Sequence, residues 1–246
     1  MTPDWRNAKA YEGVTSLMPR EIAWEFLRRN PAYRADFKKS QYMLGDAAEK
    51  ISQHWGLRFI VDPKIPANDA GVFWRHDECS SVLVLSNAKP TPKTAAFSLS
   101  DLPGFFKWRH AQEGAHILVR QQGYKFQLFA LGDVGPQDTL QVNIPIDAGA
   151  RIRCAVAGRF SRFINSEPPI QIRRRNGVYE RLRDSIRILD ARLDGVSYHE
   201  IAEVFLGTHR LEGEAWKTSS SRAVTIRLSK LGHRLMSGGY EKLLHI

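Results

Sequence analysis

The sequence contains little cysteine and no long apolar run. Cys79 and Cys154 are the only cysteines, and they lie far apart in segments of different character, so we expect two reduced thiols and no disulfide framework. No apolar stretch approaches the roughly 20 residues that a membrane helix needs. Residues 1–6 lack the basic and apolar regions of a signal peptide. These absences predict a cytoplasmic protein that does not enter a membrane.

The sequence also lacks the motifs of common enzymes. It has no Gly-rich phosphate loop, no Walker lysine motif and no nucleophile elbow. Residues 76–79 place four potential metal-ligand types in a row, but consecutive residues in a turn converge poorly on one ion. His110 and His116 bracket Glu113 without a nucleophile or a third ligand nearby, which favours a polar loop between strands. We therefore expect no catalysis, no metal and no cofactor.

Positive charge is abundant and unevenly distributed. The 246 residues include 36 Lys and Arg against 26 Asp and Glu, a formal charge of +10. Residues 151–246 carry 18 basic and 10 acidic residues, so most of the excess lies there. Such a field attracts polyanions, although charge alone does not distinguish DNA from RNA or acidic lipid.

The first part of the chain reads as helices followed by strands. Residues 19–30 predict a helix that buries Ile22, Ala23, Phe26 and Leu27 and ends before a proline, and residues 46–55 predict another. Short runs rich in β-branched and aromatic residues then predict strands at 57–61, 71–75, 81–86, 116–121, 124–129 and 140–146. A hairpin is expected at Gln122-Gly123. Together these segments predict a small, mostly antiparallel sheet.

The remainder of the chain reads as helical. Ile152, Val156, Phe160 and Phe163 repeat at helical spacing, and an amphipathic helix is expected from Tyr179 to Leu193. The predicted fold class is therefore α+β. We expect an assembly or regulatory α+β domain at residues 1–139 and an all-helical DNA-binding domain at residues 140–246.

A short capped helix is expected after residue 195. Ser197 and Glu200 have the spacing of a capping box, which satisfies the N–H groups of a helix start. Ile201, Ala202 and Phe205 then share one face, and Gly207 is expected to stop the helix.

A long basic helix follows a polar loop. Residues 219–221 are serines that offer N-cap oxygens. At about 100° per residue, one stripe is apolar and the stripe beside it is mainly cationic. The apolar stripe consists of Val224, Leu228, Leu231 and Leu235, and the other of Ala223, Arg227, Lys230 and Arg234. A capped helix, a connection and a helix with one apolar and one cationic side predict a helix-turn-helix, whereas the simpler interpretation is a solvated face on a terminal helix. Because the loop at 207–217 exceeds the usual three or four residues, it would be a variant of the motif.

The same residues resemble a known family. Residues 193–203, Trp216-Lys217 followed by residues 219–222, and the ending at 232–244 are similar to the RovC-type DNA-binding domain. Residues 4–6 and 24–33 resemble the transcriptional-regulator-like module that accompanies that domain in proteobacteria. The resemblance implies an activator of type VI secretion genes that works as a hexamer.

We therefore predict a sequence-specific transcriptional regulator that binds double-stranded promoter DNA as a homo-oligomer. The N-terminal part is expected to assemble subunits or to contact RNA polymerase. The start of the basic helix is expected to reach base edges or the nearest phosphates, and the rest of its cationic side to hold phosphates. The predicted DNA-binding residues are Ser219, Ser220, Arg222, Arg227, Lys230 and Arg234, with Arg173, Arg174 and Arg175 as further phosphate contacts.

Two other functions are open at this point. The long amphipathic helix also suits a protein-interaction module, an antiactivator that sequesters another regulator. That role, however, does not require the excess positive charge that attracts polyanions. An RNA-binding protein is a weaker alternative. Phe59, Phe73 and Trp74 lie on predicted strands, but no RNP-like run accompanies them.

Overall fold

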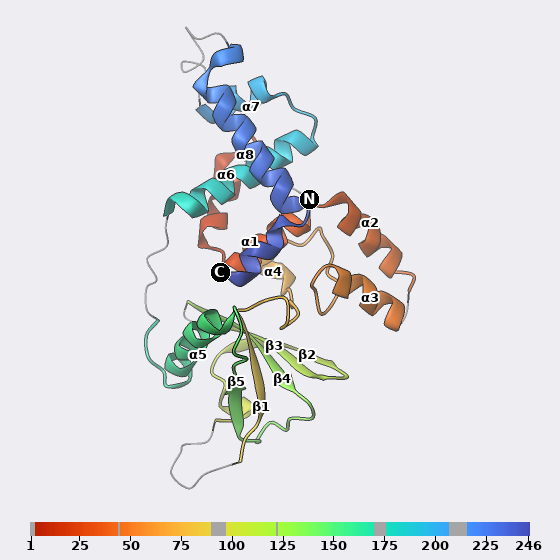
Figure 1. Ribbon diagram of the computed structural model, residues 1–246, viewed down its shortest axis with the longest axis vertical. Coiled ribbons are helices and arrows are strands. Elements are labelled where there is room, and N and C mark those ends of the chain that lie inside the picture. Colours follow the sequence, from red (N-terminus) through yellow and green to blue (C-terminus); the bar gives the residue numbers. More distant parts are fainter. Residues whose placement is uncertain (1–2, 44, 90–96, 122, 170–175, 207–215) are drawn as a thin grey trace. The chain divides into compact units, whose positions relative to one another are not determined.

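A computed structural model describes residues 3–43, 45–89, 97–121, 123–169, 176–206 and 216–246 (Figure 1). By their contacts, the described residues form two compact units, each made of segments that are separated in the sequence. The helical unit lies within Met1–Tyr42, Val61–Ala70 and Arg173–Leu243, and the sheet unit within Met43–Ile60, Gly71–Ile172 and Leu244–Ile246.

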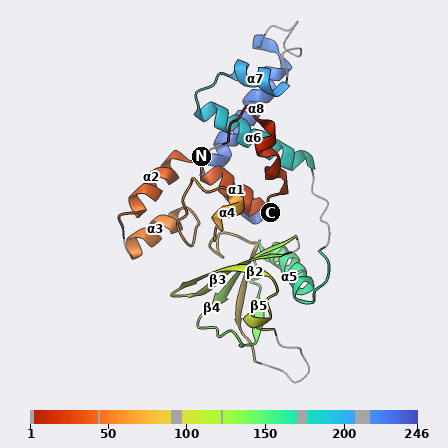
Figure 2. The ribbon, with the colours of Figure 1, turned by 180° about the vertical axis from the view of Figure 1, so that it is seen from behind.

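The helical unit consists of α-helices together with 3₁₀ helices. Its helices α6 and α8 pack against each other, and both contact α1. Helix α7 packs against the same two helices, as the two opposite views agree (Figures 1 and 2). Its elements are η1 Ala8–Ser16, α1 Pro19–Leu27, α2 Pro31–Ser40, α4 Ala67–Ala70, α6 Asn176–Leu193, α7 Tyr198–Leu206, η4 Trp216–Thr218 and α8 Ser220–Met236. A last turn, η5, spans Gly239–His245.

The first predicted helix is confirmed as α1. Pro19 occupies its first turn, and the Glu21 carboxylate accepts a hydrogen bond of 2.8 Å from the Met18 N–H, so an otherwise unpaired helix-start donor is satisfied. The side chains expected on its apolar side are fully buried, and Trp24 is fully buried with them. Trp24 is accommodated because its indole N–H donates to the Ile65 carbonyl at 3.0 Å.

The sheet unit contains a five-stranded sheet in the order β2-β3-β4-β1-β5. Strands β1 and β4 pair in parallel, and the other neighbours pair antiparallel, which confirms the mostly antiparallel prediction. The β3–β4 hairpin closes with Gln121 opposite Tyr124, at the predicted turn, and Gly123 has φ +84°. The elements are α3 Asp46–His54, β1 Val82–Asn87, η2 Leu99–Asp101, β2 Phe105–Ala111, β3 Gly114–Gln121, β4 Tyr124–Leu131, β5 Leu140–Asn143 and α5 Ala150–Ile164.

The core of the sheet unit lies between one face of the sheet and α5. Phe160 and Phe163 of α5 are buried against Phe126 and Tyr124 of β4, with ring centroids 5.3–5.4 Å apart. Helix α5 therefore follows the predicted helical spacing, but its contacts place it with the sheet. The predicted boundary at residue 140 divides the sequence, whereas the compact units alternate along it.

Two of the predicted strands are wrong. Residues 57–61 and 71–75 are joined only by an isolated bridge between Leu57 and Trp74. The bridge consists of two backbone hydrogen bonds, from the Arg58 N–H to the Phe73 carbonyl at 2.8 Å and from the Arg75 N–H to the Gly56 carbonyl at 2.9 Å. The backbone groups of Trp74 bond the Gln127 amide, which accepts from the Trp74 N–H at 3.2 Å and donates to the Trp74 carbonyl at 2.6 Å. Conversely, β2 was not predicted. Its alternation of Phe106 and Trp108 with Lys107 and Arg109 is the signal that would have found it.

Candidate nucleic-acid interface

Helix α8 begins at the predicted serine run. Ser219 is its N-cap, and the Ser219 hydroxyl accepts from the Arg222 N–H at 3.2 Å and donates to the Trp216 carbonyl at 3.1 Å. The predicted cap is confirmed. Ser219 is only 3% exposed, so its hydroxyl serves the helix start.

The buried face of α8 consists mainly of small side chains. Ser221, Thr225, Ser229 and Gly232 are buried, and α8 packs on α6. A Cβ atom on Gly232 would lie 2.7 Å from the Ser185 carbonyl oxygen of α6, so the two backbones approach closely at this point. The small residues therefore set the distance between the two helices.

The predicted apolar stripe of α8 is not the centre of its buried face. Leu235 is buried, but Val224, Leu228 and Leu231 are only half-buried. At about 100° per residue the true buried face is turned by about a quarter of a turn from the predicted stripe. The prediction was wrong here because serine, threonine and glycine do not register as apolar, although they allow the closest helix packing.

The opposite side of α8 is exposed and cationic. Ser220, Arg222, Ala223, Arg227, Lys230 and Arg234 are all exposed. Within the described residues, none of the four cations among them (Arg222, Arg227, Lys230 and Arg234) has an ion-pair partner. Helix α8 itself contains no Asp or Glu. Arg227, Lys230 and Arg234 lie together opposite the buried face, while Arg222 lies further round, in the first turn. Among the described residues nothing neutralises this positive charge, which faces solvent along nearly two turns.

Helix α7 also begins where the sequence predicts. The Ser197 hydroxyl accepts from the Glu200 N–H at 3.2 Å, which is one half of the expected capping box, and Ile201 and Ala202 are fully buried. Phe205 is partly buried against the same cluster. The predicted stop at Gly207 lies outside the described residues.

The other predicted site residues are distributed as follows. Arg173, Arg174 and Arg175 lie outside the described residues. Phe73 and Trp74, two of the three aromatic candidates for stacking on RNA bases, are each 1% exposed and therefore offer no platform. The third, Phe59, is half-buried, and the Arg109 guanidinium lies 4.0 Å from its ring centroid.

The histidine-rich segments form structural contacts in the sheet unit. Glu113 pairs with Arg58 and also bonds the His116 ring at 2.9 Å, and the hydrogen bond from Arg58 lowers the pKa of Glu113 to about 2. His116 stacks on Phe129 with centroids 4.5 Å apart, and burial lowers its pKa. In the part of the chain that the structure describes, no three His, Cys, Asp or Glu side chains gather where they could hold a metal ion.

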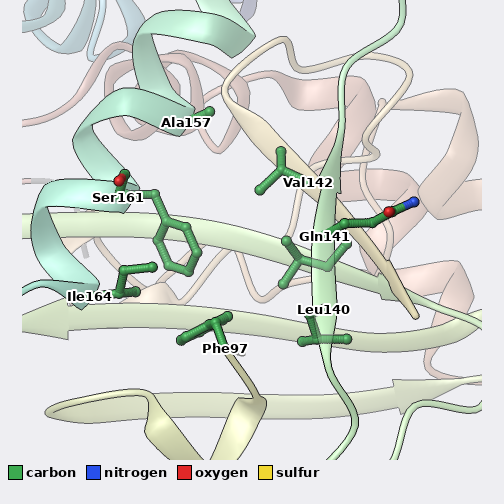
Figure 3. A pocket seen from close by; sticks show the side chains of 9 residues that line it. Phe97, Leu140, Gln141, Val142, Ala157, Ser161 and Ile164 are labelled. Carbon is green, nitrogen blue, oxygen red and sulfur yellow. The ribbon is translucent and has the colours of Figure 1, made fainter. Parts of the chain in front are cut away.

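A small pocket lies in the sheet unit between α5 and strands β1 and β5 (Figure 3). Its volume is about 120 Å³, and Phe97, Leu140, Val142 and Ile164 are among the apolar side chains that line it. No ionisable side chain lines it. The pocket therefore offers no charged group to hold a phosphate, and the candidate interface remains α8.

Two protein-family models match parts of the chain. Residues 143–245 match the model of a family described as the DNA-binding domain of type VI secretion transcription factors, the RovC type. Residues 4–60 match a proteobacterial transcriptional regulator-like domain. The two matches support a RovC-type regulator. The matched domains indicate a DNA-binding transcriptional regulator, and the family description associates it with type VI secretion.

No curated protein matches this RovC-type chain. Among the helices within the described residues, none has the length and apolar character needed to cross a membrane.

Proposed function

We propose that α7 and α8 form a variant helix-turn-helix and that the cationic side of α8 enters the major groove of promoter DNA. The carrying observation is the exposure of Arg227, Lys230 and Arg234 opposite the buried face that packs on α6. A major groove admits an α-helix whose outer side is narrow and free of acidic groups. The small Ala223 and the absence of carboxylates on α8 meet both conditions.

The residues have different proposed roles. Arg227, Lys230 and Arg234 hold backbone phosphates, because they share one side of the helix over about 10 Å of its length. Ser220 and Arg222 lie in the first turn, from which recognition helices contact base edges. The Ser219 hydroxyl is bonded within the helix start, so we assign the base contact to its neighbours. Arg173, Arg174 and Arg175 are proposed to add phosphate contacts.

The proposed biological role is activation of type VI secretion genes by a cytoplasmic homo-oligomer. The family description supports the gene class, and the resemblance supports activation and a hexamer. An oligomer also suits the physics, because several moderate helix contacts on one DNA molecule multiply in avidity. Subunit assembly or contact with RNA polymerase is assigned to the N-terminal part of the chain.

The decisive experiment is a salt titration of DNA binding with single variants of α8. Arg227→Ala and Lys230→Ala are expected to weaken binding to specific and non-specific duplexes alike. Each is expected to reduce the slope of log K against log salt by about 0.9, because one phosphate contact is lost. Fluorescence anisotropy with a promoter fragment and a scrambled fragment measures both quantities.

Two further variants make the result interpretable. Arg151→Ala removes an exposed cation from α5 and is expected to leave the salt slope unchanged. Arg222→Ala is expected to narrow the preference for promoter over scrambled DNA by about 1–3 kcal/mol, the value of one bidentate base contact. If Arg227→Ala, Lys230→Ala and Arg222→Ala all bind DNA like wild type while the protein captures another regulator from solution, the antiactivator function is correct and the proposal is wrong.

A further inference from the structure

The N-terminal segment, residues 3–30, contributes to the core around the proposed DNA-binding helices. Trp5 is 2% exposed and clusters with Ile188 and Ala191 of α6 and with Ile201 of α7. Leu228 of α8 packs against the same cluster. A tryptophan from the start of the chain therefore fills the space where the three helices meet, although residues 4–60 match a different family model from these helices.

Arg187 of α6 fixes the path of this segment. Its guanidinium donates to the Trp5 carbonyl at 2.6 Å and to the Arg6 carbonyl at 3.1 Å. The same guanidinium lies 4.0 Å from the ring centroid of Phe205 on α7. One side chain thus contacts the N-terminal backbone and α7 together.

Arg6 extends the contact to the solvent side of α7. Its guanidinium bonds the Glu200 carboxylate at 2.6 Å and lies 4.3 Å from the Trp5 ring centroid. Glu200 lies in the first turn of α7, so this pair holds the helix near its start. Both side chains are about half exposed, and either can be changed without opening the core.

The segment is anchored at two further points. Arg29 binds Asp190 of α6 through two hydrogen bonds of 2.6 and 2.8 Å, and Tyr11 donates to the same carboxylate at 2.7 Å. The Asn30 amide donates to the Met236 carbonyl at the end of α8 at 2.9 Å. The N-terminal segment therefore holds both α6 and α8 in their last turns.

We infer that the N-terminal segment is a positioning element of the DNA-binding unit, in which Trp5 and Arg6 set the placement of α7 relative to α8. The inference rests on the proposed helix-turn-helix. In a helix-turn-helix the second helix lies in the major groove while the first crosses the DNA backbone, so both are placed correctly only when their mutual orientation is fixed. A segment that contacts α6, α7 and α8 supplies that constraint.

The exposed pair Arg6–Glu200 provides the test in the full-length protein. Arg6→Ala and Glu200→Ala are each expected to increase amide hydrogen exchange in α7 and to weaken specific DNA binding by about twofold to fivefold. The double charge exchange, Arg6→Glu with Glu200→Arg, keeps the net charge and is expected to restore both properties. The Arg6→Ala salt slope is expected to match wild type, whereas a phosphate contact by Arg6 would reduce it by about 0.9.

The matched control is Lys9→Ala, which removes an exposed cation from the same segment and is expected to leave α7 exchange unchanged. If the charge-exchange variant loses as much DNA affinity as the two single variants together, without recovery, the inference is wrong. Unchanged DNA affinity despite faster α7 exchange would also overturn it. The exchange measurement needs no DNA. A wild type that binds no DNA while α7 still responds to these variants therefore identifies a failure of the proposed function instead.

Discussion

The helical unit buries a connected set of charged side chains, whereas the core of the sheet unit is aromatic and aliphatic. Glu25, Arg28, Arg29 and Asp190 are each at most 5% exposed and form one ion-pair network. In the sheet unit the pair Arg58–Glu113 reaches the surface, with Glu113 36% exposed. The two cores therefore differ in how specifically their segments pair. An apolar surface can pack against many other apolar surfaces, whereas a buried charge in a bidentate pair is satisfied only by an opposite charge in the right position.

The network joins segments that are distant in the sequence. Arg29 and Asp190 are 161 residues apart, and Glu25 also accepts the Ala67 N–H at 2.8 Å. Burial opposes ionisation of Glu25, but Arg29 and Arg28 outweigh it and lower the pKa of Glu25 below its usual value. Three segments of the helical unit therefore meet at two carboxylates.

The largest effect on stability is expected from a substitution that breaks this ion-pair network. Asp190→Ala leaves the Arg29 guanidinium buried without one of its partners and is expected to lower the free energy of unfolding by about 3–5 kcal/mol. Glu113→Ala removes the more exposed carboxylate of the sheet unit and is expected to cost under about 1 kcal/mol. Urea denaturation followed by circular dichroism measures both losses, and Asp194→Ala at the exposed end of α6 is the control. Equal losses in the two units would remove the distinction between them.

The sequence predicts the elements of both units better than it predicts their partners. Helical spacing identifies α5 and α6, and the serine cap and exposed cations of α8 follow from local pattern. The association of Trp5 with α6 and α7 cannot be predicted from the sequence, because an apolar side chain does not show which other apolar residues it will pack against. The Arg29–Asp190 pair cannot be predicted from the sequence either, since a charged residue in a helix is usually exposed to solvent.

A smaller effect compares one helical glycine in each unit. Gly232→Ala in α8 places a Cβ atom 2.7 Å from the Ser185 carbonyl oxygen and is expected to cost about 1–3 kcal/mol. Gly158→Ala in α5 meets open space and is expected to stabilise by about 0.4–1 kcal/mol, because the unfolded chain loses freedom. Thermal unfolding of the two variants gives opposite shifts if close backbone packing is confined to the α6–α8 contact. Shifts of the same sign would contradict that assignment.

The smallest expected effect is a pH dependence carried by Glu25. A carboxyl group whose pKa is lower in the folded than in the unfolded protein stabilises the fold above its unfolded pKa, here 4.5, and loses that contribution as the pH falls. Glu25→Gln lacks this titration and is less stable at pH 7. Its deficit relative to wild type is expected to shrink by up to about 0.8 kcal/mol between pH 7 and pH 4. Urea denaturation at both pH values measures the deficit. A constant deficit would mean that Glu25 has the same pKa in the folded and the unfolded protein. The buried charges would then fix how the segments of the helical unit pair without making its stability depend on pH.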